Sequence, residues 1–318
     1  MSGISGYSQE DKDRYLAMLN TVTPEEIHVR YNIAASSIRR WKREKEARAG
    51  VGTPIIKTET PVYQSPIKQG KRIAVVPDMQ IKPGIDLSYA ERIGRYLADK
   101  KPDIIVNGGD FADMPSLSAY EAPGSMGMEG QRYKDDILSV QTAMRLMMAP
   151  IQAEMARSGW KPRLVLTLGN HEDRIRRAIK ATPKLDGVIG LSDLHYEEYG
   201  WEVIPFLQPI VIEGIVFCHY FCSGIMGRPI TSARALLTKK HMSCFAFHQQ
   251  GRDIAFGTKA DGSQMIAILA GSCYEHDEDY LNHQTNNHWR GLYILNDVID
   301  GAFEENAVSL HYLRRKYP

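Results

Sequence analysis

The stretch that decides the fold is Gly108-Gly109-Asp110-Phe111-Ala112-Asp113, which comes just after the apolar run Ile104-Ile105-Val106. A short apolar run of this kind predicts a buried strand. Glycines and carboxylates just past a strand end are typical of a loop that a rigid sheet holds in place for binding or chemistry. We therefore expect an α/β fold with a functional site at this strand end.

Four further polar clusters follow the same logic along the chain. They are Asp78-Met79-Gln80, Gly169-Asn170-His171-Glu172, the isolated His219, and His248-Gln249-Gln250. The first three each follow an apolar run, at residues 73–76, 164–166 and 215–217. One such cluster is weak evidence, but five in series predict one site assembled from several strand ends.

This series resembles the calcineurin-like metallophosphoesterase superfamily, whose pattern is Asp-x-His, Gly-Asp-x-x-Asp, Gly-Asn-His-Glu/Asp, a lone His, and Gly-His-x-His. The resemblance covers roughly residues 71 to 300, and two of the elements match to the letter. The sequence departs from the pattern at three positions: Gln80 and Gln250 replace histidines, and Phe247 replaces a glycine.

The resemblance implies a four-layer α-β-β-α sandwich and a centre with one or two divalent metal ions. The metal ligands that it implies are Asp78, Gln80, Asp110, Asn170, His219, His248 and Gln250. Asp110 would bridge two ions, while His171 would protonate the leaving oxygen, oriented by Asp113. A carboxylate that orients an imidazole in this way is common in proteins.

The two glutamines both fall on the first of the two metal sites that the family forms. An amide oxygen is a neutral and weaker donor than an imidazole nitrogen, so we expect Mn²⁺ or Mg²⁺, more than Zn²⁺ or Fe, or an empty first site. Three alternatives stay open: a labile first ion, a one-metal enzyme, or a scaffold without turnover. The intact His171 and Asp113 pair favours turnover.

Other polar residues near these clusters are weaker candidates. Arg174 and Arg177 share a helical face after the Gly-Asn-His-Glu turn, where they would bind substrate phosphates or pair with Glu172 or Asp173. Four late residues would shape the mouth of the site or replace a missing ligand: His276, His283, His288 and Trp289.

The chain divides into a helical unit at 1–48, a flexible linker at 49–70 and a phosphoesterase domain at 71–318. In the first unit, the capped start of a second helix is predicted by Thr23, Pro24 and Glu26. Asn32 predicts a left-handed turn before a third helix. The linker contains Pro54, Pro61 and Pro66. In the large domain, helical spacing of apolar residues predicts helices over 88–100 and 133–157.

The helical unit resembles a helix-turn-helix of the repressor and transposase type. Residues 39–48 hold six cations and two anions, a local charge of +4, which suits the phosphates of DNA or RNA. The candidate nucleic-acid contacts are Ser36, Ser37, Arg39, Arg40, Lys42 and Arg43. The alternative is a three-helix cap or oligomerisation unit whose charges face solvent.

Composition adds limits without choosing a function. The 318 residues carry a net charge of +1, with 43% hydrophobic and 24% charged residues, as in an ordinary globular protein. No apolar run is long enough for a transmembrane helix, and the polar start at 1–14 has no signal core, so we expect a cytosolic protein, in the host cytoplasm if phage-encoded. Cys218 and Cys222 bracket His219, but their spacing favours buried free thiols over a zinc site.

Three functional hypotheses follow from these patterns. The first is a metal-dependent phosphodiesterase acting on nucleic acid, a nuclease that the N-terminal unit delivers to DNA; this arrangement resembles phosphoesterases encoded by bacteriophages. The second is a nucleotide or phosphoprotein phosphatase with an assembly-type N-terminal unit that forms a homo-oligomer. The third is a nucleic-acid-binding regulator with a weakened metal centre.

Overall fold

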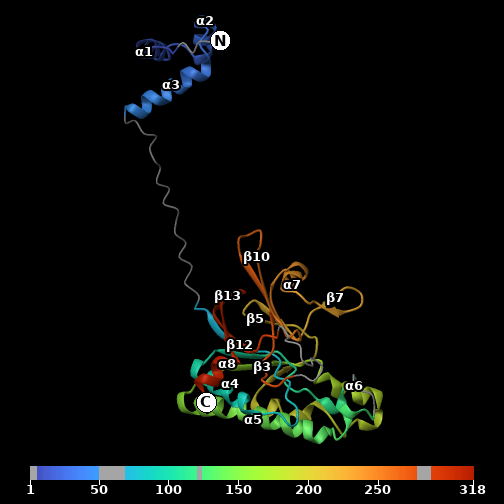
Figure 1. The fold of residues 1–318 in the computed structure, drawn as a ribbon. Helices are drawn as coiled ribbons and strands as arrows, with labels where there is room; N and C mark the ends of the chain where they lie inside the picture. The colour runs from blue at the N-terminus through green and yellow to red at the C-terminus, as the bar shows by residue number, and fades with distance from the viewer. Residues whose placement is uncertain (1–5, 50–68, 120–123, 278–287) are drawn as a thin grey trace. The chain divides into compact units, whose positions relative to one another are not determined.

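The computed structural model describes residues 6–49, 69–119, 124–277 and 288–318 and divides the chain into two compact units, Met1–Pro66 and Ile67–Pro318 (Figure 1). The linker that the sequence predicts at 49–70 falls almost wholly outside the described residues. Within the described ranges, no helix is both long and apolar enough to cross a membrane.

The N-terminal unit contains three helices: α1 (Gln9–Met18), α2 (Pro24–Tyr31) and α3 (Ala35–Arg48). The predicted start of α2 is confirmed, since Thr23 caps the helix and exchanges hydrogen bonds with Glu26. Asn32 has a φ of 54° and ends α2 in the left-handed conformation. A small apolar core joins the helices through Leu16, Ile27, Ile33, Ile38 and Trp41.

The large unit is a mixed α/β structure with two main sheets. Its strands are β1 (Lys71–Val76), β2 (Ile104–Asn107), β3 (Arg163–Thr167), β4 (Glu202–Ile204), β5 (Ile210–Ile212), β6 (Ile215–Cys218), β7 (Cys222–Ser223), β8 (Arg228–Pro229), β9 (Ser243–Ala246), β10 (Arg252–Thr258), β11 (Gln264–Ala270), β12 (Gly291–Ile299) and β13 (Ala302–Ser309). Its helices are α4 (Ser88–Lys100), α5 (Tyr133–Ser158), α6 (Asp173–Ala181), α7 (Ala233–Lys240) and α8 (Leu310–Lys316). Short 3₁₀ turns lie at Pro115–Leu117, Met126–Met128, Pro183–Leu185, Leu191–Leu194 and Glu197–Tyr199.

The first sheet has the order β13-β12-β1-β2-β3-β4, and the second has the order β10-β11-β9-β6-β5. Strands β1 to β4 are parallel, as are β6, β9 and β11, whereas β12, β13, β5 and β10 run antiparallel to their neighbours. Strands β7 and β8 form a separate hairpin.

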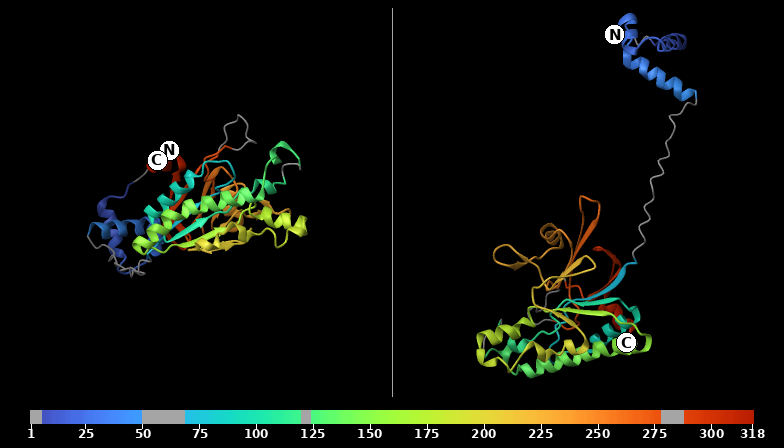
Figure 2. Two further views of the ribbon diagram at one scale, coloured as in Figure 1. Left: turned by 90° about the horizontal axis from the view of Figure 1, so that it is seen from below. Right: turned by 180° about the vertical axis from the view of Figure 1, so that it is seen from behind.

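Side-chain alternation along the strands builds two faces on each sheet. In β1, Ile73 and Val75 face the second sheet, while Ala74 and Val76 face the helices α4 and α5. Helix α5 runs along the outer face of the first sheet (Figure 2), and α7 packs on β9, β10 and β11 of the second sheet. The described residues therefore form four layers: helices, sheet, sheet and helix.

Candidate metal centre

The candidate site lies where parallel strands of both sheets end, because β1, β2, β3, β6 and β9 lead directly into the five polar clusters. Backbone hydrogen bonds join the loops. The amides of Met79 and Gln80 both donate to the carbonyl oxygen of Asp110, at 3.0 and 2.8 Å, and Cys273 N donates to Asp78 O at 2.7 Å. The loops after β1 and β2 are thus held together by their main chains.

Glu172 ties the loop after β2 to the loop after β3. Its buried carboxylate accepts hydrogen bonds from the backbone amides of Asp110 and Ala112, both at 3.0 Å, and of Gly169 at 2.9 Å. Burial raises the pKa of Glu172, and the negative charge of Asp110 adds to this rise. From the sequence, Glu172 was expected only as a motif residue and as an alternative partner of Arg174 or Arg177, because a local pattern does not show the distant amides that it binds.

Close packing explains two glycines and one departure from the family pattern. A Cβ at Gly169 would overlap the Asp110 carboxylate, and one at Gly108 would overlap the ring of Phe247. Phe247, which stands where the family pattern has glycine, is fully buried between the sheets. The ring of Phe247 therefore fits because Gly108 has no side chain.

Three predicted ligands form a compact cluster. The ligand atoms of Asp110, His219 and His248 all lie within 4.8 Å of one another. Nδ1–H of His219 donates to the carbonyl oxygen of Gly108 at 2.8 Å, and its Nε2 faces Asp110 Oδ2 at 3.2 Å and Asn170 Oδ1 at 3.0 Å. Because Nδ1–H donates to Gly108, Nε2 can face these two oxygens either as a second N–H or as a lone pair directed at a metal ion. The donor set fits a divalent transition metal.

The electrostatics of the cluster also fit a cation. Burial alone would lower the pKa of His219, but the charge of Asp110 and a hydrogen bond to it raise that pKa to about 9. Burial and the neighbouring His219 lower the pKa of His248 to about 4, so its imidazole is neutral and free to ligate. The pKa of Asp110 is lowered despite burial, since His171 and His219 stabilise its charge.

Besides Asn170, the other predicted ligands are Asp78, Gln80 and Gln250, on the loops after β1 and β9. Asp78 is fully buried, and burial raises its pKa to about 7. Gln250 Nε2 donates to Asp78 Oδ2 at 3.2 Å, while Gln250 Oε1 is buried and has no hydrogen-bond partner among the described residues. A rotation of this amide by 180° would exchange its two end atoms, so that Oε1 instead of Nε2 would face Asp78. Gln80 is nearly buried and has a φ of 44°.

The predicted acid pair is assembled. His171 Nδ1–H donates to Asp113 Oδ1 at 2.6 Å, and its Nε2 lies 3.7 Å from Asp110 Oδ2. Burial opposes protonation of His171, but the charge of Asp110 and the hydrogen bond to Asp113 outweigh it, so the pKa of His171 is raised. The imidazole is therefore protonated more readily than an isolated histidine, and its Nε2 faces the cluster.

The sequence predicts that Arg174 and Arg177 share a helical face that binds substrate phosphates, but in the structure each has a different set of protein partners. Arg174 is buried and donates to the carbonyl oxygens of Asp113 and Met114, at 2.9 and 3.2 Å, so it holds the Asp113 loop. Arg177 donates to Asn170 O at 2.8 Å and lies 3.5 Å from Asp173, which is the alternative pairing expected from the sequence. Both arginines therefore have protein partners.

Two of the late candidates pair with the loop after β9: Trp289 N donates to the carbonyl oxygen of the predicted ligand Gln250 at 3.0 Å, and His288 forms a β-bridge with Gly251. His276 stacks on Tyr274 with ring centres 4.4 Å apart, and His288 lies 3.4 Å from the Tyr274 hydroxyl. His283 lies outside the described residues. All four cysteines are free, and Cys222 is exposed, contrary to the expectation of a buried thiol.

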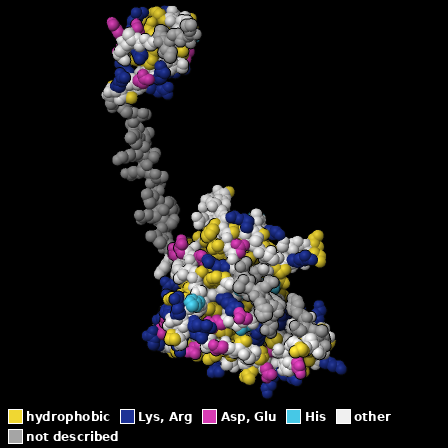
Figure 3. All heavy atoms as spheres, viewed as in Figure 1, with side chains coloured by type: hydrophobic (Ala, Val, Ile, Leu, Met, Phe, Trp, Pro, Cys, Tyr) yellow, Lys and Arg dark blue, Asp and Glu magenta, His cyan; other side chains and the backbone are white. Residues whose placement is uncertain are grey.

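The predicted nucleic-acid contacts lie on α3. Ser36, Arg39, Arg40, Lys42 and Arg43 are exposed, and cationic side chains are visible along this helix (Figure 3). Ser37 is half-buried. Three of the cations have acidic partners: Arg39 pairs with Glu25, Arg40 with Glu44 at 3.7 Å, and Lys42 with Glu46 at 4.0 Å. Exposed pairs of this kind are weak and can exchange for phosphates.

Comparison of the chain with protein-family models finds no match, and no curated protein matches its sequence.

Proposed function

We propose that this protein is a divalent-metal-dependent phosphodiesterase of the calcineurin-like type and that it acts on nucleic acid. The layered α-β-β-α arrangement of the large unit and the order of the five polar clusters support this assignment.

The observation that carries the proposal is the meeting of the Asp110, His219 and His248 cluster with the His171 and Asp113 pair. The two groups come from different loops, and His171 Nε2 is 3.7 Å from Asp110 Oδ2. Bound metal would neutralise the phosphoryl oxygens and lower the pKa of an attacking water. Asp110, Asn170, His219 and His248 would hold one ion, and Asp78 with Gln80 and Gln250 a weaker second one.

The chain's own residues supply the remaining chemistry. His171 would give its Nε2 proton to the leaving oxygen, while Asp113 fixes the ring and stabilises its protonated form. Arg174 would act through Asp113, because its guanidinium binds the carbonyl of that residue. A purely binding protein has no need of a proton donor in this position, so the arrangement favours an enzyme over a regulator.

A screen of metals and substrates tests the proposal. We expect Mn²⁺-stimulated hydrolysis of bis-p-nitrophenyl phosphate and of DNA, with loss of both activities in Asp110→Asn. Exclusive hydrolysis of p-nitrophenyl phosphate, a monoester, would instead favour the phosphatase hypothesis. Binding of DNA without hydrolysis of any ester, under every metal tested, would favour the regulator.

A further inference from the structure

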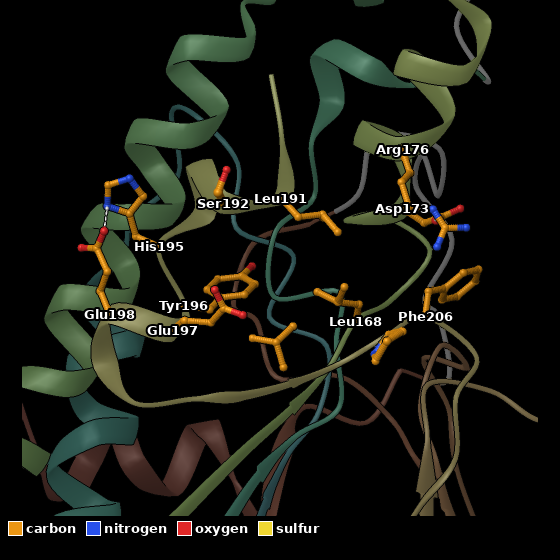
Figure 4. A pocket seen from close by; sticks show the side chains of 12 residues that line it. Leu168, Asp173, Arg176, Leu191, Ser192, His195, Tyr196, Glu197, Glu198 and Phe206 are labelled. Carbon is orange, nitrogen blue, oxygen red and sulfur yellow. Dashed lines mark ion pairs between the residues drawn. The ribbon is translucent and has the colours of Figure 1, made fainter. Parts of the chain in front are cut away.

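A cavity of about 520 Å³ lies beside the candidate metal centre, between α6, the end of β4 and the 3₁₀ turns at 191–199. Its volume falls within the range of small-molecule sites. Leu168, Tyr196 and Phe206 line it, with Asp173 and Arg176 toward one end and His195 and Glu198 toward the other (Figure 4).

The cavity is joined to the metal centre by a row of aromatic rings. The ring of Phe206 lines the cavity and lies 6.2 Å from the ring of His219, a candidate ligand. Phe206 also packs at 5.6 Å against Tyr220, whose ring is 5.1 Å from that of His248. A group bound in the cavity would therefore be separated from a phosphate at the cluster by about one aromatic ring, that of Phe206.

The lining selects against a phosphate and for a neutral ring. Three carboxylates line the cavity, those of Asp173, Glu197 and Glu198, whereas Arg176 is the one permanently cationic residue among the described lining residues. The apolar wall offers contact area for a flat ring, and aromatic side chains stack on bases of any sequence.

One buried polar atom can also recognise such a ring. Asp173 is 8% exposed, and its Oδ1 accepts no hydrogen bond from the described residues, although Arg176 Nε lies 3.3 Å away. A carboxylate oxygen accepts hydrogen bonds only, so it suits an N–H group on the edge of a base.

We propose that this cavity binds an unstacked nucleobase next to the scissile phosphate, an inference that rests on the proposed phosphodiesterase function. A base inside a duplex cannot reach such a cavity without leaving its stack. The substrate class is therefore single-stranded nucleic acid, or an unpaired or frayed segment, in preference to intact duplex.

The first test uses the full-length protein with Mn²⁺ and single-stranded oligonucleotides in which one abasic nucleotide is moved along the chain. We expect kcat/KM to fall about tenfold or more when the missing base is the one next to the cleaved bond, and intact duplex to be cut more slowly. Equal rates for all single strands and duplex, with normal hydrolysis of bis-p-nitrophenyl phosphate, would overturn the cavity proposal and leave the proposed function standing.

The second test measures binding without turnover. Val203 lines the cavity from β4, and Val203→Phe should fill it; Val211 is 58% exposed on β5, so Val211→Phe is the matched control. The probe is a phosphorothioate trinucleotide containing 2-aminopurine, read by its fluorescence. We expect Val203→Phe to weaken binding about tenfold and Val211→Phe to leave it unchanged.

Thermal melting shows whether each variant folds, and Ser192→Trp, at an exposed position on the cavity rim, serves if Val203→Phe does not. Unchanged trinucleotide binding in a folded cavity-filling variant would overturn the proposal. Loss of binding in a protein that hydrolyses no ester would support the cavity while contradicting the proposed catalysis.

Discussion

At the scale of single residues, the candidate site combines constrained backbone with charged side chains. Gln80, Asp110 and His248 all have positive φ values, of 44°, 46° and 67°, which cost side-chain-bearing residues of the order of 1 kcal/mol or more each. Such conformations persist where surrounding contacts enforce them. Here the Asp110 carbonyl accepts two amides and the Asp110 amide donates to Glu172.

His171 is the residue on which the proposed proton transfer depends. His171→Ala should lower kcat by about 10²–10⁴-fold for a diester with a poor leaving group. The loss should be smaller for p-nitrophenolate, which leaves without a proton. His311→Ala, at an exposed position on α8, is the matched control and should change neither rate. Full activity of His171→Ala on the poor leaving group would show that another group donates the proton.

Asp136 makes stability depend on pH. It is buried on α5 and accepts from Ser116 N and Oγ, at 3.1 and 2.5 Å, while its Oδ1 has no partner among the described residues. Burial raises its pKa from 3.8 to about 6. Because the folded pKa is the higher one, its stabilising contribution is full below about pH 4 and is lost as pH rises through 6.

Asp136→Asn removes this titration and should leave the variant more stable than the natural protein at pH 7, by about 2 kcal/mol. The difference should shrink as the pH falls from 6 to 4. Urea unfolding at several pH values measures it, with Asp135→Asn, the exposed neighbour, as the control. A stability difference that stays constant over this range would show that Asp136 keeps its ordinary pKa.

The two glutamines should set the occupancy of the metal centre. The cluster of Asp110, His219 and His248 keeps two imidazoles, so it should fill first and retain its ion through dialysis. The double change Gln80→His and Gln250→His should raise the amount of tightly bound Zn²⁺ or Mn²⁺ toward two per chain. Metal analysis after dialysis measures this. Two equally tight ions in the unaltered protein would contradict the asymmetry.

At the scale of elements, the loops after β2 and β3 act as one piece because Glu172 accepts three of their amides. Glu172→Gln places an amide NH₂ group against backbone N–H donors, so it leaves buried donors unsatisfied at a cost of about 1–3 kcal/mol. We expect a lower melting temperature together with weaker metal binding. Glu304→Gln, on the exposed part of β13, should change neither. Normal metal affinity in Glu172→Gln would show that metal binding does not depend on the hydrogen bonds that Glu172 accepts from the two loops.

Local sequence patterns predicted the helices well, but they could not predict contacts between segments that are distant in the sequence. Apolar spacing predicted α4 at its observed bounds of 88–100 and α5 to within one residue at its end. Arg174 was predicted to bind substrate phosphates or to pair with Glu172 or Asp173, yet it is buried against carbonyls 60 and 61 positions earlier in the chain. Helical periodicity shows which residues share a face of a helix, but it does not show which distant segments of the chain pack on that face. The same reason hides the cavity, whose lining joins β4 to α6.

At the scale of the whole molecule, the N-terminal unit has its own apolar core, built from residues of that unit alone. Deleting residues 1–48 should therefore leave hydrolysis of bis-p-nitrophenyl phosphate nearly unchanged. The same deletion should raise KM for long DNA, because a tethered binding unit raises the effective concentration of substrate at the site. Size-exclusion chromatography of both proteins gives the oligomeric state. A smaller assembly with unchanged DNA affinity would assign the helices to oligomerisation.

The charge of α3 makes a sharper prediction for the intact protein. Arg43 is exposed, and a cation that contacts a phosphate releases a counterion on binding. Arg43→Ala should weaken DNA binding and reduce the slope of log K against log salt by about 1, the share of one phosphate contact. Arg315→Ala, which removes an exposed arginine from α8, keeps the net charge the same as in Arg43→Ala and should leave the slope unchanged. Equal slopes in the two variants would mean that net charge, and not the α3 surface, attracts the nucleic acid. Fluorescence anisotropy of a labelled oligonucleotide at several salt concentrations decides between the two.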